Sequence, residues 1–237
     1  MSKQQDGVRR VRAYHLVCGL IDAVLAVLTK RRVGPAQLPP GPLLIAPNHV
    51  SSADPLVVAC AVLRRGRVPR FVIRAEVMRW PVVGAVLRYF DHLPLDRDAK
   101  GDTSRLEPIE RALRRGECVV VYPEGKLTPR EDLMPGRGQP GVALLSAATG
   151  APIVPVATWG THELLRDRRS TLLAWPPRRP RVDVVFGRAL PPVAPGSLSD
   201  AVRATRALMA ELTELTAQAR RGWERADSGS RAVADAP

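Results

Sequence analysis

Leu43-Leu44-Ile45-Ala46-Pro47-Asn48-His49-Val50-Ser51-Ser52-Ala53-Asp54-Pro55 is the stretch of sequence that decides the fold. It begins with an apolar run between two prolines, which is typical of a strand buried on both faces. It ends with Asp54 followed by Pro55, which is typical of a helix N-cap with proline at the first helical position. The stretch therefore predicts a strand, a turn and a helix, the unit from which α/β proteins are built.

His49 and Asp54 lie five residues apart across this predicted turn. In a continuous helix, two residues with this spacing would diverge around the axis. Through a turn, the carboxylate can reach one imidazole nitrogen and leave the other to take a proton from a substrate. The same spacing also fits a loop histidine beside an aspartate that only caps a helix, and the rest of the chain bears on this choice.

Three further segments combine a short apolar run with polar or turn residues. They are residues 90–97, which end in Asp96-Arg97; residues 118–126, where a β-branched run meets Pro123-Glu124-Gly125-Lys126; and residues 151–156, an apolar run with two prolines. Glycine lets a backbone approach a ligand closely, and open α/β sheets place their sites at strand ends. The segment around Gly125 is therefore a second candidate for a site.

The order and spacing of these four segments resemble the glycerolipid acyltransferases of the lysophosphatidic acid acyltransferase family. Asn48, His49 and Asp54 match the N-H-x4-D block of that family, and Arg97 matches the arginine that ends its second block. Residues 122–125 match part of its F-P-E-G-T-R-S block, and residues 151–156 match its V-P-I-V-P-V block. The resemblance covers about residues 40–160.

The resemblance implies transfer of a fatty acyl group from acyl-CoA or acyl carrier protein to the free hydroxyl of 1-acylglycerol-3-phosphate. His49 would be the base, and Asp54 would fix its tautomer as in a catalytic dyad. An arginine can grip a phosphate as a charged fork, so Arg97 would hold the acceptor. The complete set expected to bind substrate is Asn48, Arg97, Glu124, Gly125, Lys126 and Arg130.

Three departures from the family pattern fall on the acceptor side. Lys126-Leu127-Thr128 stands where the family has Thr-Arg-Ser, Asp91 where it has a glycine, and Gln139 where it often has a lysine. Acyl transfer to another lipid or glycolipid hydroxyl therefore stays open. So does a non-catalytic peripheral membrane protein of the same fold, although His49 and Asp54 argue against it.

Composition favours an anionic membrane surface as a partner. The 237 residues include 36 Lys+Arg and 23 Asp+Glu, for a formal net charge of +13. Nucleic acid is the weaker partner, because aromatic residues make up only 4% and no nucleic-acid-binding motif is present. The three cysteines are far apart and predict a reducing compartment. No histidine pair has metal-ligand spacing, so we expect neither a metal nor an organic cofactor.

The N-terminal segment predicts a helix at the cytoplasmic side of the cell membrane. Residues 13–29 are mostly apolar and lie between arginines at 9, 10 and 12 and the basic run 30–32. Apolar residues recur at helical spacing, which predicts an amphipathic, interfacial helix held by anionic head groups. Asp22 argues against a membrane span and a cleaved signal peptide. The alternative is an amphipathic helix packed on the core. The proposed stripe comprises Tyr14, Val17, Cys18, Ile21, Val24, Leu25 and Leu28.

The whole chain predicts one α/β domain with a largely parallel or mixed sheet flanked by helices. We expect a membrane-associating segment at residues 1–34, a catalytic domain at 35–222 and a disordered tail at 223–237. Further helices are expected at 55–64, 80–88, 104–115, 141–149 and 199–221, with further strands at 70–74 and 182–186.

Overall fold

The structure, a computed structural model, describes residues 3–96, 103–166, 169–170 and 179–234. Its strands are β1 Lys30–Val33, β2 Leu43–Pro47, β3 Pro69–Arg74, β4 Leu93–Leu95, β5 Cys118–Val120, β6 Ile153–Trp159, β7 Leu165–Arg166, β8 Arg169–Ser170 and β9 Arg181–Phe186. Its α-helices are α1 Lys3–Leu28, α2 Asp54–Leu63, α3 Pro81–Tyr89, α4 Glu107–Arg114, α5 Gly141–Thr149 and α6 Leu198–Ala234. Its 3-10 helices are η1 Val77–Arg79, η2 Thr103–Leu106 and η3 Thr161–Glu163.

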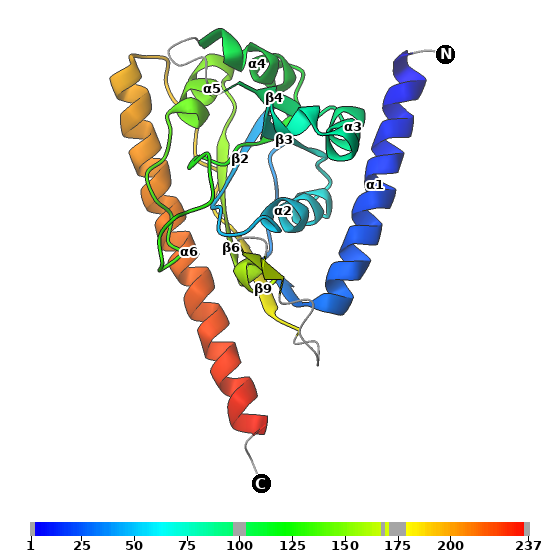
Figure 1. The fold of residues 1–237 in the computed structure, drawn as a ribbon. Helices are drawn as coiled ribbons and strands as arrows, with labels where there is room; N and C mark the ends of the chain where they lie inside the picture. Colours follow the sequence, from blue (N-terminus) through cyan, green and yellow to red (C-terminus); the bar gives the residue numbers. More distant parts are fainter. Residues whose placement is uncertain (1–2, 97–102, 167–168, 171–178, 235–237) are drawn as a thin grey trace.

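A seven-stranded sheet in the order β1-β9-β6-β2-β5-β3-β4 forms the centre, with helices on both faces (Figure 1). Neighbouring strands are parallel except β6 and β9, which are antiparallel. The strands β7 and β8 form a separate hairpin. The predicted α/β architecture with a mixed, mostly parallel sheet is therefore confirmed.

The strand β2 lies in the middle of the sheet and contributes to both halves of the core. Leu43 and Ile45 belong to the cluster that includes α1 and α2, whereas Leu44 and Ala46 belong to the one with α4 and α5. This division follows from the alternation of side chains along a strand. With both faces covered, the carboxyl end of β2 is held at one fixed edge of the sheet.

The predicted helices of the catalytic domain are present, and two glycines end them as their positions suggest. Gly116 closes the turn after α4 with φ 81°, and Gly150 caps α5 with φ 69°. Both values lie in the left-handed region, which glycine adopts without steric cost. The element boundaries read from the sequence therefore hold to within a few residues here.

The N-terminal helix is longer than predicted and is not amphipathic in the predicted sense. Tyr14, Cys18 and Leu25, which belong to the stripe assigned to the membrane, are buried in the core cluster shared with α2. The opposite side is also apolar, since Leu16 and Leu20 are exposed. The stripe is therefore divided: these three residues pack on the protein, as the alternative predicts, whereas Val17 and Val24 of the same stripe are exposed. Contact of the exposed residues with lipid stays a prediction.

By length and composition alone, the stretch Gly7–Leu28 of α1 is long and apolar enough to cross a membrane. Asp22 lies within this stretch, but its charge is paired, because its carboxylate forms ion pairs with Arg31 and Arg64. These pairs lower the pKa of Asp22, although burial acts in the opposite direction. The protein itself therefore neutralises the one acid that argued against an apolar segment.

The expected boundary after residue 34 does not separate two structural units. Strand β1, which falls inside the predicted membrane segment, pairs in parallel with β9 as the edge of the sheet. Arg31 is one of the basic residues assigned to lipid head groups, but its side chain is 10% exposed and paired with Asp22. Only the neighbouring Lys30 and Arg32 of this basic run are exposed.

The C-terminal helix α6 runs to Ala234 instead of ending near Arg221. Residues 223–234, expected to be disordered, are therefore helical, and residues 235–237 lie outside the described residues. Trp223 gives a physical reason for the start of this extension, because its indole N–H donates to the carbonyl oxygen of Arg181 at 2.8 Å. This contact fixes α6 to β9 beyond the predicted end of the helix.

Candidate active site

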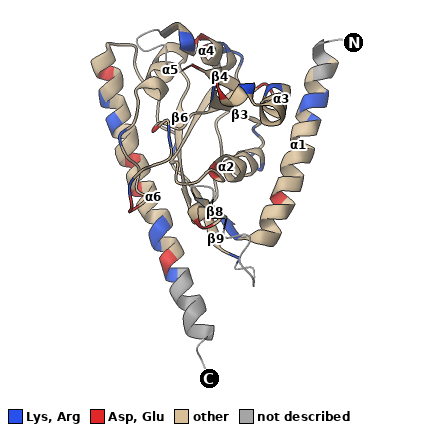
Figure 2. Ribbon diagram, in the orientation of Figure 1, with Lys and Arg blue, Asp and Glu red and all other residues tan. Residues whose placement is uncertain are grey.

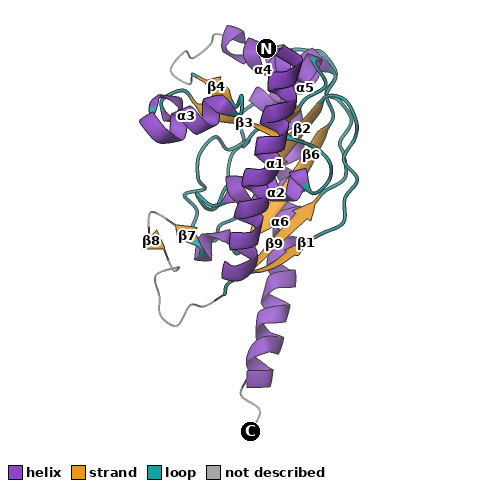
Figure 3. Cartoon of the chain, turned by 90° about the vertical axis from the view of Figure 1, so that its right-hand side faces the viewer, coloured by secondary structure: helices purple, strands orange, loops and turns teal. Residues whose placement is uncertain are grey.

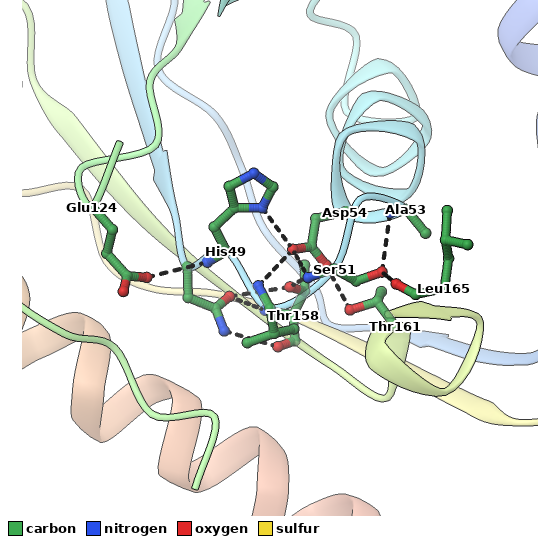
Figure 4. Close-up of polar contacts among 10 residues, drawn as sticks. His49, Ser51, Ala53, Asp54, Glu124, Thr158, Thr161 and Leu165 are labelled. Carbon is green, nitrogen blue, oxygen red and sulfur yellow. Dashed lines mark hydrogen bonds and ion pairs between the residues drawn. The ribbon is translucent and has the colours of Figure 1, made fainter. Parts of the chain in front are cut away.

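The turn between β2 and α2 is organised around the carboxylate of Asp54 (Figure 4). Its Oδ2 atom accepts the backbone N–H groups of Val50 and Ser51, both at 2.8 Å. Asp54 is fully buried and is the first residue of α2, whose N-cap is Ala53. The expected N-cap role is therefore wrong by one position: the carboxylate binds the N–H groups of the preceding turn, not those of the helix.

His49 is the other half of the predicted pair, and the structure brings the two together. Its Nδ1 lies 3.0 Å from Asp54 Oδ2, and its side chain keeps 18% exposure. A carboxylate at this position favours the tautomer with the proton on Nδ1, which leaves Nε2 as a base. Figure 4 shows the second ring nitrogen pointing away from Asp54.

The ring of Tyr122 stacks on the imidazole of His49, with centroids 4.1 Å apart and an interplanar angle of 29°. The Tyr122 hydroxyl is buried and has no hydrogen-bond partner among the described residues. Burial raises its pKa well above the usual range, and the charge of Asp54 adds to this shift. Tyr122 thus acts through its ring, which restricts the orientation of His49.

The segment that follows β5 also holds the backbone of His49. Glu124 Oε1 accepts the N–H of His49 at 3.3 Å, and the N–H of Thr128 donates to the carbonyl oxygen of His49 at 2.7 Å. Glu124 Oε2 accepts the N–H of Gly136 at 2.9 Å. Two segments that are 75 residues apart in sequence are therefore fixed as one unit.

Glu124 was expected to bind substrate, and the structure gives its carboxylate a positioning role. The side chain is buried, and both oxygens accept backbone N–H groups. Burial raises the pKa of Glu124, and these hydrogen bonds partly oppose the shift. Gly125 follows in a tight turn with φ 70°, where a side chain would be strained. Contact of either residue with substrate stays a prediction.

The expectation that Asn48 binds substrate is wrong. Its side chain is fully buried, and its amide makes a two-way link to β6. Asn48 Nδ2 donates to the carbonyl oxygen of Thr158 at 3.0 Å, and Oδ1 accepts the Thr158 N–H at 2.7 Å. A buried amide needs such partners, so Asn48 joins the end of β2 to the neighbouring strand.

Two threonines that the sequence analysis missed complete the shell around Asp54. The hydroxyls of Thr158 and Thr161 lie 3.2 and 2.5 Å from Asp54 Oδ1. Thr161 reaches this position because Gly160, with φ 88°, ends β6 in a tight turn. A Cβ atom on Gly160 would lie 1.9 Å from the carbonyl oxygen of Arg181, so only glycine fits. The Gly160-Thr161 pair after an apolar strand was the available signal.

The basic residues predicted to bind the acceptor are not assembled in the described part of the chain. Arg97 lies outside the described residues. Lys126 is exposed, and Arg130 makes a two-pronged ion pair with Asp132 at the surface. This ion pair raises the pKa of the Arg130 guanidinium and lowers the pKa of Asp132 to about 2. Binding of an acceptor by these residues stays a prediction.

Asp91 replaces a family glycine, and its backbone explains why glycine is usual there. Its φ is 54°, in the left-handed region that other residues adopt at a cost. Arg10 and Arg70 form ion pairs with its carboxylate, and Arg70 also donates to its carbonyl oxygen. Aspartate tolerates this conformation better than most residues, and these contacts hold it there.

Comparison with known proteins supports the relationship suggested by this geometry. The family model described as Acyltransferase matches residues 31–159, which is just over half of the chain. A lyso-ornithine lipid O-acyltransferase of Rhizobium meliloti is 31% identical over 68% of this chain and 53% of its own length. A probable 1-acyl-sn-glycerol-3-phosphate acyltransferase of Mycoplasma genitalium is 27% identical over 52% of this chain and 46% of its own length.

This chain thus spans about half the length of these two relatives. The crystal structure of the 1-acyl-sn-glycerophosphate acyltransferase PlsC from Thermotoga maritima has the same fold. Its TM-score is 0.68 at 18% identity, covering 96% of this chain and 84% of that one. The matched family segment contains His49, Asp54 and the strands β2, β5 and β6, whereas Thr161 lies just beyond its end. The chain therefore belongs to the acyltransferase family.

Proposed function

We propose that this protein transfers a fatty acyl group from an acyl thioester to the free hydroxyl of 1-acylglycerol-3-phosphate, giving phosphatidic acid. The observation that carries the proposal is the 3.0 Å contact between His49 Nδ1 and the buried carboxylate of Asp54. A base held in one tautomer, with its second nitrogen outward, suits the activation of a hydroxyl.

The proposed reaction needs no covalent intermediate on the enzyme. His49 Nε2 removes the proton of the acceptor hydroxyl as its oxygen attacks the thioester carbonyl. The carbon–sulfur bond then breaks, and the imidazolium returns the proton to the departing thiolate, so that an ester and a thiol leave. Asp54 stabilises the imidazolium between these steps. Ser51 is unsuited as a nucleophile, because its buried hydroxyl binds the Leu165 carbonyl oxygen.

A second candidate is the same transfer to another lipid hydroxyl. The lyso-ornithine lipid acyltransferase of Rhizobium meliloti is at least as similar to this chain as the glycerol-phosphate acyltransferase relatives are. The replacement of Thr-Arg-Ser by Lys126-Leu127-Thr128 also leaves the phosphate contacts of the family incomplete. Lysine is a point charge and not a planar fork, so acceptor geometry would be less strictly fixed.

The deciding experiment supplies purified protein with acyl-CoA or acyl carrier protein thioesters and a panel of acceptors. The panel contains 1-acylglycerol-3-phosphate, a lyso-ornithine lipid and a monoacylglycerol, and products are identified by mass. The proposal expects phosphatidic acid as the main product, made by wild type and lost in His49→Ala. If the main product comes from another acceptor, the second candidate is favoured instead. A folded protein that acylates none of them would contradict the proposal and favour the non-catalytic alternative.

Arg97→Ala tests the proposed phosphate contact. Loss of one charge-assisted contact should lower kcat/KM for the phosphate-bearing acceptor by about one to two decades. The monoacylglycerol has no phosphate and serves as the internal control, so its kcat/KM should stay near the wild-type value. An equal fall for both acceptors would show that Arg97 has a structural role instead.

The proposed transfer uses neither a metal nor an organic cofactor, because the thioester already activates the acyl group. Activity should therefore survive exhaustive chelation. Loss of activity on chelation, with recovery on adding a divalent ion, would contradict this part of the proposal.

We place the protein at the cytoplasmic side of the cell membrane, bound peripherally through the outer side of α1. Leu16, Leu20 and Val27 on that side are exposed, whereas the opposite side packs on α2. A helix with one face docked on the protein meets lipid with the other face only, which supports peripheral binding. The three free, buried cysteines agree with a reducing compartment.

A further inference from the structure

The helix α3 packs on the protein through a glycine and not through its apolar side chains. Gly84 is its only buried residue, and a Cβ atom there would lie 2.2 Å from the carbonyl oxygen of Met78. Arg88 donates to the same carbonyl oxygen of η1. Because the helix rests on a glycine, its larger side chains are left outside the core.

Those side chains are apolar, which is unusual for a surface helix. Val82 is 76% exposed, and Val83, Val86 and Tyr89 are about half exposed. Trp80, at the N-terminal cap, is also exposed. A helix of nine residues is too short to be stable alone, and exposed valines add little helix propensity. Such a surface indicates a partner that covers it.

The C-terminal end of α3 packs against α1. Tyr14 of α1 packs edge-on against Phe90, the C-cap of α3, with ring centroids 5.1 Å apart. Figure 3 views this side of the molecule and shows both helices toward the reader, with α2 behind α1. We call this surface the α1–α3 face. It consists of the exposed side chains of Leu16, Leu20, Val27, Trp80, Val82, Val86 and Tyr89.

An arginine-lined cleft of about 370 Å³ lies where the two helices meet. Arg9 and Arg10 come from α1, Arg88 and Tyr89 from α3, and Asp91 is the only acid among the lining residues. Arg10 pairs with Asp91, so the cleft keeps a formal positive charge. Figure 2 shows basic residues on the end of α1 beside α3. Guanidinium groups suit phosphate oxygens in both shape and charge.

We propose that α3 is a second membrane-docking element, and that the α1–α3 face binds a bilayer whose anionic head groups enter the arginine-lined cleft. The apolar side chains of α3 enter the interface, and Trp80 and Tyr89 lie at its two ends, as aromatic residues do at membrane surfaces. The cleft supplies the charge complementarity that singles out an anionic bilayer as the occupant. The inference rests on the peripheral membrane binding proposed above for α1.

The test measures partitioning of full-length protein onto vesicles of phosphatidylcholine alone and of phosphatidylcholine with phosphatidylglycerol. Val82→Gln combined with Val86→Gln should lower partitioning onto both vesicles by about tenfold or more. Arg9→Gln should lower it by about fivefold on the anionic vesicles only. Leu198→Gln and Arg206→Gln on α6 are matched controls, because both residues are exposed on the opposite side of the molecule and should bind as wild type.

Turnover of a short-chain, water-soluble acceptor separates this inference from the proposed function. It should be unchanged in the α3 variant, because no α3 residue belongs to the site. Vesicle binding by the α3 variant equal to that of wild type would overturn the inference and leave the acyl transfer intact. So would a wild-type dimer in sedimentation that the α3 substitutions dissociate without altering vesicle binding; the partner would then be a second copy.

Discussion

The turn around Asp54 and the α1–α3 face differ in how their side chains are covered. In the turn, the Asp54 carboxylate is fully buried and bound by backbone, imidazole and hydroxyl groups. On the α1–α3 face, apolar side chains such as Leu20 and Val82 are mostly exposed. The polar groups of the first region find their partners within the chain, whereas the apolar side chains of the second are left mostly uncovered by the described residues.

This difference predicts how the two regions respond to mutation. Changes in the turn should lower activity, stability or both, because each buried polar group relies on its partner. Changes on the α1–α3 face should leave the fold intact, because the side chains contribute little to the core. Substitutions at five residues test this contrast.

The largest effect should come from His49→Ala. General base catalysis is worth about two to four decades in rate, so acyl transfer should fall by that factor while the protein stays folded. Asp54→Asn should lose transfer and also stability, because the carboxylate holds the whole turn. The measurements are kcat and the free energy of unfolding. If folded His49→Ala protein has wild-type turnover, His49 is not the base.

His92 lies beneath the α1–α3 face and should make stability depend on pH. Its Nδ1 accepts the N–H of Phe71 at 3.1 Å. Burial, helped by the charge of Arg70, lowers its pKa to about 4. The unfolded value is about 6.5, so the unfolded state binds more protons between these pH values. The free energy of unfolding therefore does not depend on His92 above about pH 6.5. It decreases as the pH falls from 6.5 towards 4, by up to about 3 kcal/mol.

The measurement compares the free energy of unfolding of wild type and His92→Gln across this pH range. The difference between the two proteins isolates His92 from carboxyl groups that titrate in the same region. Equal pH dependence in both proteins would contradict the assignment.

Thr161→Val should have an intermediate effect, because it removes one donor to Asp54 Oδ1. Hydrogen bonds to charged groups are worth about 1.5–3 kcal/mol, so the free energy of unfolding should fall by that amount and kcat should fall with it. Thr161→Ser keeps the hydroxyl and is the matched control. If the valine variant loses stability but retains kcat with an unchanged pH profile, Thr161 does not position the dyad.

The smallest effect on stability should come from Leu20→Gln on the α1–α3 face. Leu20 is 68% exposed, so the free energy of unfolding should change by less than about 0.5 kcal/mol. Vesicle binding should nevertheless weaken, since the side chain is proposed to enter the bilayer. A large loss of stability would mean that this side of α1 is covered by the protein itself.

Local patterns were sufficient for the strand, turn and helix around His49. The apolar run of β2 is typical of a strand buried on both faces, and Asp54-Pro55 is typical of the start of a helix, and both elements form there. The His49–Asp54 pair is short in sequence, so its contact depends on one turn. Gly116 and Gly150 directly follow two of the predicted helices and adopt positive φ there, which is a local property of the backbone.

Long-range contacts decided the rest of the site. Asn48 and Thr158 are 110 residues apart, and Asp54 and Thr161 are 107 apart, so no local pattern pairs them. Glu124 likewise holds the backbone of a residue 75 positions away. Such partners are selected by strand order, which places β6 and β5 on either side of β2.

The sequence by itself determined the composition of each helix, but the tertiary structure decided which face of it is covered. For α1, helical spacing reveals an apolar stripe that suits a membrane as well as a core, since both exclude water. The position of α2 resolved this ambiguity by burying Tyr14, Cys18 and Leu25, which left Leu16 and Leu20 outside. For α3, Gly84 rests on the carbonyl oxygen of Met78, and that one backbone contact turned the valines outward. The hydrophobic effect is not directional, so only the arrangement of neighbouring elements assigns an apolar side chain to the core or to the surface.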